Sequence, residues 1–330
     1  MRLLVLGGTR FVGRAIVAEA LARGFDVTVV SRGESDVPQR GVTWFKADRT
    51  VPDSLQPLTS TAWDAVIDTW DGAAEVVAGS TALLARASNW YGYVSSRSVY
   101  RWPMAAGSDE SARAVDPASD AGYPAAKRGA ELAVLDRFDG RCLLARAGLI
   151  VGPHEDTGRL TWWLHRADVG GWLVAPEPAD LVWQLIDARD LAGFMLDAAA
   201  GRTTGVYNVV CPRSQAITTS RLVEACVSVT GGRADPRWVP AALLARAGVA
   251  AWDDLPGWIP PGDEAAGMHD CNVSAAVAAG LTCRPIETTV ADTWAWQQTL
   301  PPRSRRPLRE GLPRRGLSAE QEQAIWWLTR

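Results

Sequence analysis

The stretch "MRLLVLGGTRFVGR", residues 1–14, is the most informative part of this sequence about the fold. A short apolar run, Leu3–Leu6, leads into a glycine turn, and an amphipathic pattern follows over Phe11–Arg23. A strand, a glycine turn and a helix in this order form the first half of a βαβ unit. Backbone amides and the helix dipole then favour a phosphate over the turn. We therefore predict a nucleotide-binding turn formed by Gly7, Thr9, Arg10, Phe11, Val12 and Gly13.

The alternation of strand-like and helix-like patterns continues through the first half of the chain. Further apolar runs occur at Val27–Val30, Val42–Phe45, Ala65–Ile67, Tyr91–Val94 and Cys142–Leu144. Amphipathic stretches such as Ala73–Ala87 and Tyr123–Phe138 separate several of them. Strands separated by helices predict right-handed crossovers and a parallel sheet covered on both faces. The predicted fold class is α/β, a doubly wound parallel sheet with a smaller C-terminal substrate-binding domain.

The rhythm changes after Gly152-Pro153, where tryptophans and prolines become frequent. We predict a dinucleotide-binding domain over residues 1–152, with a return of the chain to it near residues 182–200. Residues 153–330 then form mainly the substrate-binding domain and a C-terminal tail. The segment "PPRSRRPLREGLPRRG", residues 301–316, is typical of a solvated connector and favours that interpretation over a nucleic-acid arm. A short helix is expected from Ser318.

Composition restricts the class of protein. The chain has 330 residues, 47% of them hydrophobic and 22% charged, with a formal net charge of −3. These values predict a soluble globular protein without a charge that would attract nucleic acid or an anionic membrane. No signal peptide, membrane-spanning run or metal site is expected. The five cysteines show no C-x-x-C spacing, which indicates reduced thiols and a cytoplasmic location. An arginine-rich chain with two lysines suggests a bacterial source.

The end of the second predicted strand indicates which dinucleotide would bind. NAD sites usually place an acidic residue there to accept hydrogen bonds from the ribose 2′-hydroxyl. This strand ends in Ser31-Arg32-Gly33, with no carboxylate before Glu34. A serine and an arginine suit a 2′-phosphate, because guanidinium offers paired donors. Together with Arg10 in the neighbouring turn, they predict NADP(H) as the cofactor.

A second motif, "YPAAK" at residues 123–127, predicts acid–base chemistry. The i, i+4 spacing places Tyr123 and Lys127 on one face of a helix. Free tyrosine has a pKa of about 10, and an adjacent ammonium stabilises the phenolate and lowers that pKa. The lysine can also bind the nicotinamide ribose. Serines in "YGYVSSRSVY", residues 91–100, lie where a parallel strand ends, and a hydroxyl there could hydrogen-bond a substrate carbonyl.

In these motifs the chain resembles the short-chain dehydrogenase/reductase superfamily, in its extended or atypical branch of NAD-dependent epimerase/dehydratase-like proteins. The matching segments run in the family's order and are "GGTRFVG", "WDAVIDT", "YVSSRSVY", "YPAAK", "RAGLIVGP" and "QLIDARDLAGFML". The resemblance implies a Rossmann domain in which Ser96, Tyr123 and Lys127 are catalytic. It also implies an acidic residue near the adenine at Asp48, and cofactor contacts at Thr69 and Trp70.

Three departures from the family pattern limit the implied substrate. Sugar-nucleotide dehydratases carry an Asp-Glu pair where this chain has Arg97 and Ser98, so dehydration of that kind is not expected. Gly148 and Ile150 stand in a segment where many sugar-nucleotide members carry asparagine. The glycine that usually follows Tyr100 is replaced by Arg101-Trp102. Candidate substrate contacts are Arg97, Trp102, His154 and Trp162.

Motifs and resemblance together predict an NADPH-dependent reductase. It would transfer hydride to a carbonyl, an imine or an activated alkene of a small, largely apolar molecule, and the "GGTRF" and "SRG" segments look most like isoflavone-reductase-like proteins. The first alternative is an epimerase with tightly bound NAD(P). The second is a non-catalytic nucleotide- or RNA-binding protein on the same fold. The expected partner is a small molecule, without nucleic acid or membrane, and the chain is expected to be a monomer or a homodimer.

Overall fold

The structure, a computed structural model, describes residues 1–34, 37–301, 308–309, 311–312 and 315–330. The chain forms two compact units. The first comprises Met1–Gly148, Ala188–Val210 and Cys271–Thr282, and the second comprises Leu149–Asp187, Cys211–Asp270 and Cys283–Arg330. The domain division predicted from sequence lay after residue 152, with a return near residues 182–200. In the structure, residues 188–210 are the first of two later segments that pack with the N-terminal unit.

A seven-stranded parallel sheet forms the centre of the first unit and confirms the predicted doubly wound fold. Its strands are β1 (Arg2–Leu6), β2 (Asp26–Ser31), β3 (Thr43–Lys46), β4 (Ala65–Asp68), β5 (Tyr91–Ser96), β6 (Cys142–Ala147) and β11 (Gly205–Val209). Their order is β11-β6-β5-β4-β1-β2-β3. The chain therefore runs outward from β1 to β3 and then reverses through β4. In such sheets ligands bind at the carboxyl ends of the strands beside this reversal.

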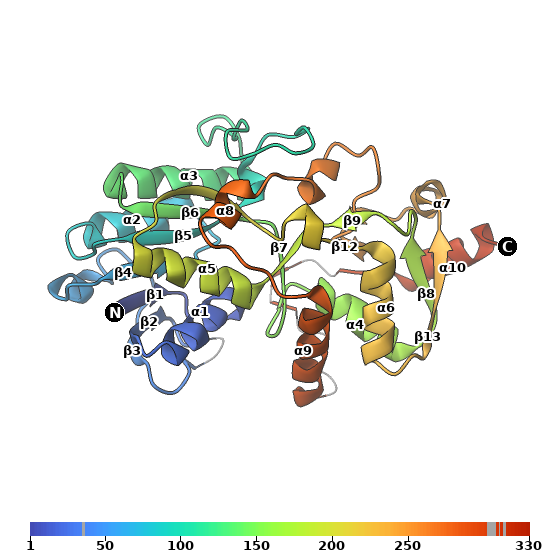
Figure 1. The fold of residues 1–330 in the computed structure, drawn as a ribbon, viewed down its shortest axis with the longest axis horizontal. Helices are drawn as coiled ribbons and strands as arrows, with labels where there is room; N and C mark the ends of the chain where they lie inside the picture. The colour runs from blue at the N-terminus through green and yellow to red at the C-terminus, as the bar shows by residue number, and fades with distance from the viewer. Residues whose placement is uncertain (35–36, 302–307, 310, 313–314) are drawn as a thin grey trace. The chain divides into compact units, whose positions relative to one another are not determined.

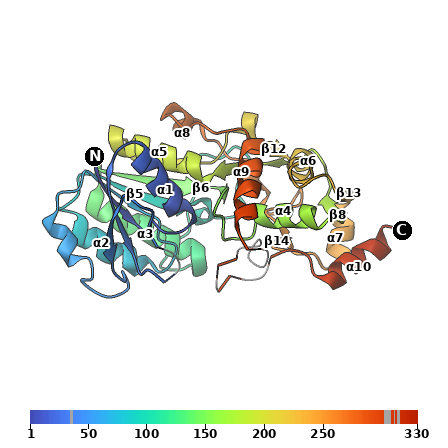
Figure 2. The ribbon, with the colours of Figure 1, turned by 90° about the horizontal axis from the view of Figure 1, so that it is seen from below.

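Two pairs of helices cover the sheet. Helices α1 (Phe11–Ala22) and α5 (Ala188–Gly201) pack together on one face, and α2 (Ala74–Leu84) and α3 (Gly122–Phe138) pack together on the other (Figures 1 and 2). The inner strands are apolar on both faces, because helices bury both. Edge strand β3 is instead mostly exposed. Short 3-10 helices lie at Gln56–Ser60 (η1) and Arg97–Val99 (η2).

Residues 271–282 return to the first unit without a signal in the sequence. Their helix α8 (Ser274–Ala278) packs against β11. The side-chain amide of Asn208 donates a hydrogen bond of 3.1 Å to the carbonyl oxygen of Asn272. This contact joins residues 64 positions apart in the chain, so local periodicity could not predict it.

The second unit has its own apolar core, which includes the buried Trp162, Trp163, Trp183 and Trp258. Its strands are β7 (Leu149–Val151), β8 (Gly171–Pro176), β9 (Val182–Trp183), β10 (Leu185–Asp187), β12 (Ile217–Thr218), β13 (Ala234–Val239), β14 (Ala251–Trp252) and β15 (Leu255–Pro256). Its α-helices are α4 (Leu160–Val169), α6 (Thr219–Val229), α7 (Ala241–Arg246), α9 (Ile286–Thr299) and α10 (Ala319–Leu328). Its 3-10 helices are η3 (Arg213–Gln215) and η4 (Ala266–His269).

The helix predicted from Ser318 is confirmed as α10. Ser318 is its N-cap and forms a reciprocal capping box with Gln321. The connector before it, residues 301–316, is described only in part, and residues 302–307, 310, 313 and 314 lie outside the described residues. Arg315, within the described part, forms an ion pair with Asp253. None of the helices that the structure describes combines the length and apolar character needed to cross a membrane.

Candidate active site

The glycine turn between β1 and α1 allows a close approach of backbone to backbone. Gly7 has a φ of +98°, a conformation that L side chains rarely adopt, and a Cβ there would lie 2.4 Å from Oγ1 of Thr69. A Cβ at Gly13 would lie 1.9 Å from the carbonyl oxygen of Gly7. Both glycines are therefore required by packing. They bring the first turn of α1 against the end of β1.

The N-terminus of α1 has the properties of an anion site. In the described structure its N-cap side chain, Arg10, makes no capping hydrogen bond, and the first turn contains no acidic residue. The amides of Thr9, Arg10, Phe11 and Val12 start the helix, whose positive dipole end favours a phosphate. Thr9 and Phe11 are buried and Arg10 is exposed. The turn thus fits the pyrophosphate of a dinucleotide, held by backbone rather than side chains.

Ser31 ends β2 and Arg32 follows it, close to the glycine turn. The amide of Gly7 donates a 3.0 Å hydrogen bond to the carbonyl oxygen of Val30, which joins the turn to β2. The Arg32 Nε lies 3.3 Å from a carboxylate oxygen of Glu34, and both side chains are at least half exposed. Exposed pairs contribute about 0–1 kcal/mol, so a phosphate could displace Glu34. Ser31 Oγ accepts a hydrogen bond of 3.1 Å from the Trp44 indole.

Lys46 is a second cation near the carboxyl end of β2. It was not among the cofactor residues predicted from the sequence. It pairs with Ser31 in the register of β2 and β3, and its Cε lies 3.5 Å from where a Cβ of Gly33 would be. Two cations, Arg32 and Lys46, therefore flank the carboxyl end of β2. The alignment of β3 with β2 could have revealed Lys46, because residues opposite in a register lie side by side.

Asp48 follows β3 and is held in a local turn. Its Oδ1 accepts hydrogen bonds of 2.9 Å from the Thr50 amide and 2.7 Å from the Thr50 hydroxyl. These two hydrogen bonds lower the pKa of Asp48, and the nearby charge of Arg32 adds a smaller effect. Asp48 therefore lies near Arg32, and its contact with the adenine stays a prediction.

Lys127, on α3, is buried beneath the ends of β4 and β5. Its Nζ donates hydrogen bonds of 2.7 Å to the carbonyl oxygen of Trp70 and 2.6 Å to that of Val94. It also lies 4.2 Å from the centre of the Tyr93 ring. An ammonium has three donors, and two of them are used in these hydrogen bonds of the described structure, so the third can serve a ligand such as a ribose hydroxyl. Burial lowers the pKa of Lys127 to about 8, although the charges of Asp71, Asp68 and Glu131 oppose this effect.

Lys127 is expected to titrate close to pH 8, and the ammonium is the protonated form below that value. If this ammonium binds the cofactor, affinity falls as the pH rises through about 8, because the neutral amine no longer offers a charged donor. Carbon-13 labelling of lysine side chains gives two signals, since the chain contains two lysines. A Lys127 midpoint at its usual value of 10.5 would contradict this prediction.

Tyr123 and Ser96 complete the predicted catalytic set in the first unit. Tyr123 lies one turn before Lys127 on α3 and is 48% exposed. Ser96 ends β5, two residues after Val94, and its Oγ accepts a 3.1 Å hydrogen bond from the Ser98 amide. Tyr93, whose ring lies against Lys127, is unsuited to proton transfer. Burial, followed by the charges of Asp68 and Tyr123, raises its pKa far above its usual value.

The two remaining predicted cofactor residues, Thr69 and Trp70, follow β4. Thr69 Oγ1 donates to the carbonyl oxygens of Leu6 and Gly7 over 3.1 and 3.2 Å, which ties the end of β4 to the glycine turn. The Trp70 indole donates a 2.9 Å hydrogen bond to the carbonyl oxygen of Ala73. The Trp70 backbone is therefore part of the Lys127 site, whereas its side chain is held by the following loop.

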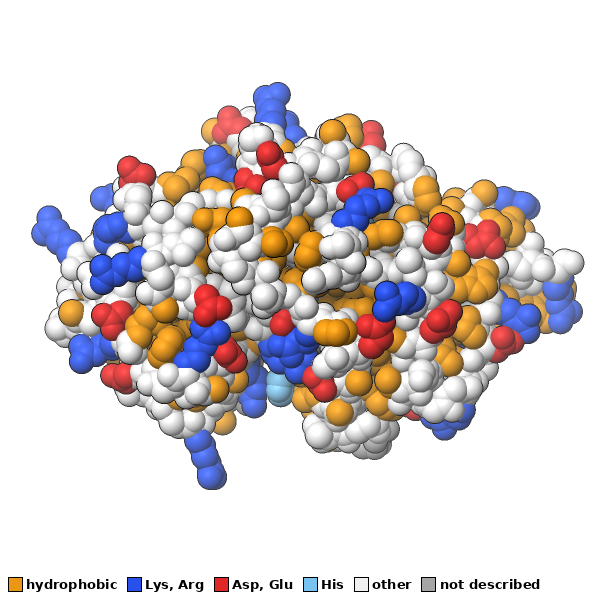
Figure 3. All heavy atoms as spheres, viewed as in Figure 1, with side chains coloured by type: hydrophobic (Ala, Val, Ile, Leu, Met, Phe, Trp, Pro, Cys, Tyr) orange, Lys and Arg blue, Asp and Glu red, His pale blue; other side chains and the backbone are white. Residues whose placement is uncertain are grey.

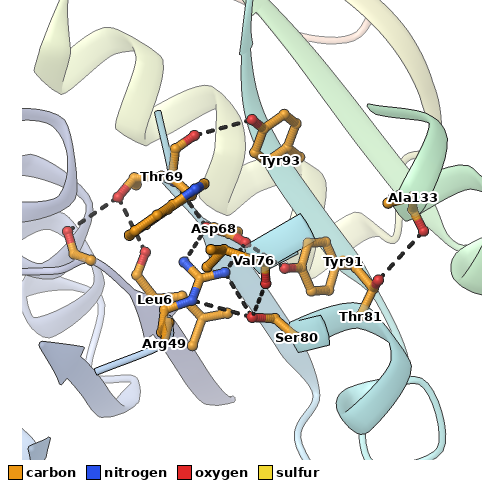
Figure 4. Close-up of polar contacts among 12 residues, drawn as sticks. Leu6, Arg49, Asp68, Thr69, Val76, Ser80, Thr81, Tyr91, Tyr93 and Ala133 are labelled. Atoms are coloured by element: carbon orange, nitrogen blue, oxygen red, sulfur yellow. Dashed lines mark hydrogen bonds and ion pairs between the residues drawn. The ribbon is translucent and has the colours of Figure 1, made fainter. Parts of the chain in front are cut away.

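A buried ion pair lies beside this segment and was not predicted. The two terminal guanidinium nitrogens of Arg49 donate to Asp68, Nη1 to Oδ1 over 2.7 Å and Nη2 to Oδ2 over 2.6 Å. Ser80 and Tyr91 point toward the same pair (Figure 4). Burial raises the pKa of Asp68, but the charge of Arg49 and the hydrogen bonds outweigh it and lower the pKa overall.

The predicted substrate residues divide between the two units. Arg97, fully buried, and Trp102 belong to the first unit, as does the catalytic set. His154 and Trp162 belong to the second. His154 has a φ of +68° and its ring centre lies 5.0 Å from that of Trp296, whereas Trp162 is buried in the core of that unit. Among the described residues, no group of three or more His, Cys, Asp or Glu side chains could hold a metal ion.

Comparison with solved structures identifies proteins of the same fold. A UDP-glucose 4-epimerase with UDP-glucose from Thermotoga maritima has a TM-score of 0.68 and 15% identity, with 91% of this chain and 99% of that chain covered. Bordetella bronchiseptica WbmH in complex with NAD+ has a TM-score of 0.69, 14% identity and coverage of 90% and 98%. A Thermus thermophilus UDP-glucose 4-epimerase complexed with NAD has a TM-score of 0.63, 20% identity and coverage of 90% and 98%. At these identities the likeness is one of fold.

Comparison with curated protein sequences gives no match. The sequence pattern of the NAD dependent epimerase/dehydratase family, in contrast, matches residues 3–209. This range includes the glycine turn, the seven strands of the sheet except the first residue of β1, and Ser96, Tyr123 and Lys127. Because the match spans more than half of the chain, this protein belongs to the NAD dependent epimerase/dehydratase family, as its motifs implied.

Proposed function

We propose that this protein is an NADP-dependent oxidoreductase that reduces a carbonyl, an imine or an activated alkene of a small, largely apolar molecule. The observation that supports NADP(H) most directly is the end of β2, where Arg32 and Lys46 replace the carboxylate expected for NAD. A 2′-phosphate would meet two cations there. Reductases commonly use NADPH, so the choice of cofactor also favours reduction.

Each residue of the catalytic set has one task in this proposal. A bound nicotinamide would supply the hydride. Tyr123, half exposed on α3, donates a proton to the substrate oxygen as negative charge develops on it. Ser96 donates a hydrogen bond to the same oxygen. Lys127, held by the carbonyl oxygens of Trp70 and Val94, binds a cofactor hydroxyl with its third donor.

Titration of the apo-protein with NADPH and NADH, followed by the fluorescence of its 16 tryptophans, tests the cofactor assignment. NADPH is expected to bind more tightly. Arg32→Ala should weaken NADPH binding about 10- to 100-fold, the effect of one hydrogen bond between charged groups, and leave NADH nearly unchanged. The control is Arg237→Ala, since Arg237 forms a similar exposed pair with Asp235. Equal binding of both dinucleotides would reject NADP selection.

An epimerase with tightly bound NAD(P) is the second candidate, and the family match and the neighbouring epimerase structures favour it. In such an enzyme the hydride returns to the same substrate, so the cofactor is not consumed. The two functions differ in one measurement. An epimerase would copurify with NAD(P) and convert its substrate without a change in absorbance at the NADPH wavelength.

A binding protein without catalysis is the alternative from another class. On the face of the molecule seen in Figure 3, basic and acidic side chains are interspersed. A continuous basic surface is typical of proteins that bind nucleic acid through phosphates. If the chain nevertheless bound RNA, its affinity would fall steeply with salt, and Ser96, Tyr123 and Lys127 would not be needed.

A further inference from the structure

The Arg49–Asp68 ion pair has no part in the reaction proposed above. Both side chains are buried, Arg49 with 5% and Asp68 with 0% of the side chain exposed. Removing two charges from water costs about as much free energy as their attraction returns. The pair is therefore expected to add little to the stability of the folded protein. Its role is better explained by the groups that it holds in place.

The hydrogen bonds of Asp68 lead from Arg49 to the candidate catalytic lysine. Its Oδ1 accepts a hydrogen bond of 2.9 Å from the Trp70 amide. The carbonyl oxygen of Trp70 accepts 2.7 Å and 3.0 Å hydrogen bonds from Lys127 Nζ and from the Tyr93 hydroxyl. The Trp70 backbone is thus fastened to the ion pair at its N–H and to Lys127 at its C=O.

We propose that the Arg49–Asp68 pair is a positioning element for Lys127, because it holds the Trp70 backbone where the Trp70 carbonyl accepts the Lys127 ammonium. The other acceptor of Lys127 is the carbonyl oxygen of Val94, which belongs to central strand β5 and is held by the pairing of β5 with β6. Trp70 lies beyond the end of β4, in a loop, where backbone is less constrained. The importance of this positioning for catalysis rests on the proposed function, in which Lys127 binds the cofactor.

The charges around Lys127 include that of Asp68, which links the ion pair to Lys127 a second time. The negative charges of Asp71 and Asp68, from the loop after β4 and the end of β4, and of Glu131, from its own helix, act on Lys127. From β5 the Tyr93 ring lies against it. Glu131 is itself paired with Arg146 at 2.9 Å. Asp68 therefore affects Lys127 in two ways, through the Trp70 backbone and through its own negative charge.

Two double variants separate positioning from charge and leave no unpaired arginine in the core. In Arg49→Met with Asp68→Asn, the Asn side-chain oxygen still accepts from the Trp70 amide. In Arg49→Met with Asp68→Leu, this acceptor is lost. Lysine labelled with 15N reports on the ammonium directly, since Lys46 is the only other lysine. We expect proton exchange at Lys127 Nζ to rise roughly tenfold or more in the Leu variant, as its carbonyl acceptor becomes mobile, and to stay near wild type in the Asn variant.

The affinity for NADPH distinguishes positioning of Lys127 from a purely structural role of the ion pair, because only positioning makes the effect depend on Lys127. The Leu variant is expected to weaken NADPH binding about tenfold, as loss of one charged hydrogen bond does. In a Lys127→Met background the same double substitution should cause no further loss. Unchanged Nζ exchange in a folded Leu variant would overturn the proposal, whether or not NADPH binds. If the Leu variant does not fold, Asp68→Glu keeps the charge opposite Arg49 but displaces the carboxylate from Trp70, and unchanged exchange there would also overturn it.

Discussion

Replacing Tyr123 with phenylalanine is expected to lower turnover about 10²- to 10⁴-fold, the contribution of a positioned general acid. The substitution removes only the hydroxyl that donates the proton. Since the side chain is 48% exposed, the free energy of unfolding should change by less than about 0.5 kcal/mol. Dinucleotide affinity should stay close to wild type, because the turn, Arg32 and Lys127 are intact. The measurement is NADPH oxidation with a panel of aldehydes, ketones and cyclic imines, alongside fluorescence titration.

Tyr207→Phe is the matched control for this experiment. Tyr207 also belongs to the first unit and is partly exposed, and its hydroxyl donates a 3.0 Å hydrogen bond to the carbonyl oxygen of Thr204. It lies on β11 at the edge of the sheet, away from β4 and β5. Its substitution should leave turnover unchanged. Full activity of the Tyr123→Phe variant would remove Tyr123 from the mechanism under both the reductase and the epimerase interpretation.

Gly13→Ala is expected to have the largest effect on stability and on nucleotide binding together. A Cβ would lie 1.9 Å from the Gly7 carbonyl oxygen and 3.0 Å from the Gly8 Cα. These are backbone atoms, so α1 must move away from β1 to accommodate the methyl group. We expect a loss of about 3 kcal/mol or more in the free energy of unfolding. Dinucleotide binding should also be lost, because the amides at the start of α1 move with the helix.

Gly79→Ala shows whether this loss comes from the site or from replacing any helical glycine. Gly79 lies in α2, is exposed, and would bring a Cβ within 4 Å of no other heavy atom in the described structure. Alanine is favoured over glycine in a helix by about 0.5–1 kcal/mol. Denaturant unfolding should therefore show a slightly more stable protein with unchanged cofactor affinity. Equal effects of the two substitutions would contradict the close approach at Gly13.

Local patterns in the sequence were sufficient to predict the fold class. Apolar runs separated by amphipathic helices predicted the doubly wound sheet, and the glycines at residues 7 and 13 predicted the turn that follows β1. These features depend on neighbours within a few positions, since helix and strand periodicity are local properties. The same holds for Tyr123 and Lys127, which one helical turn places on the same face. Their roles, together with the choice of NADP(H), remain predictions for the experiments above.

The contacts between the candidate site residues and groups far away in the sequence are determined by the tertiary structure. Arg49 pairs with Asp68 across 19 positions. Lys127 reaches carbonyl oxygens 57 and 33 positions away. The register of β2 and β3 places Lys46 opposite Ser31, the residue before Arg32, and residues 271–282 return to the first unit through α8. The physical reason is that a buried charge must find its partner wherever packing places one. That partner is set by strand order and register rather than by any pattern along the chain.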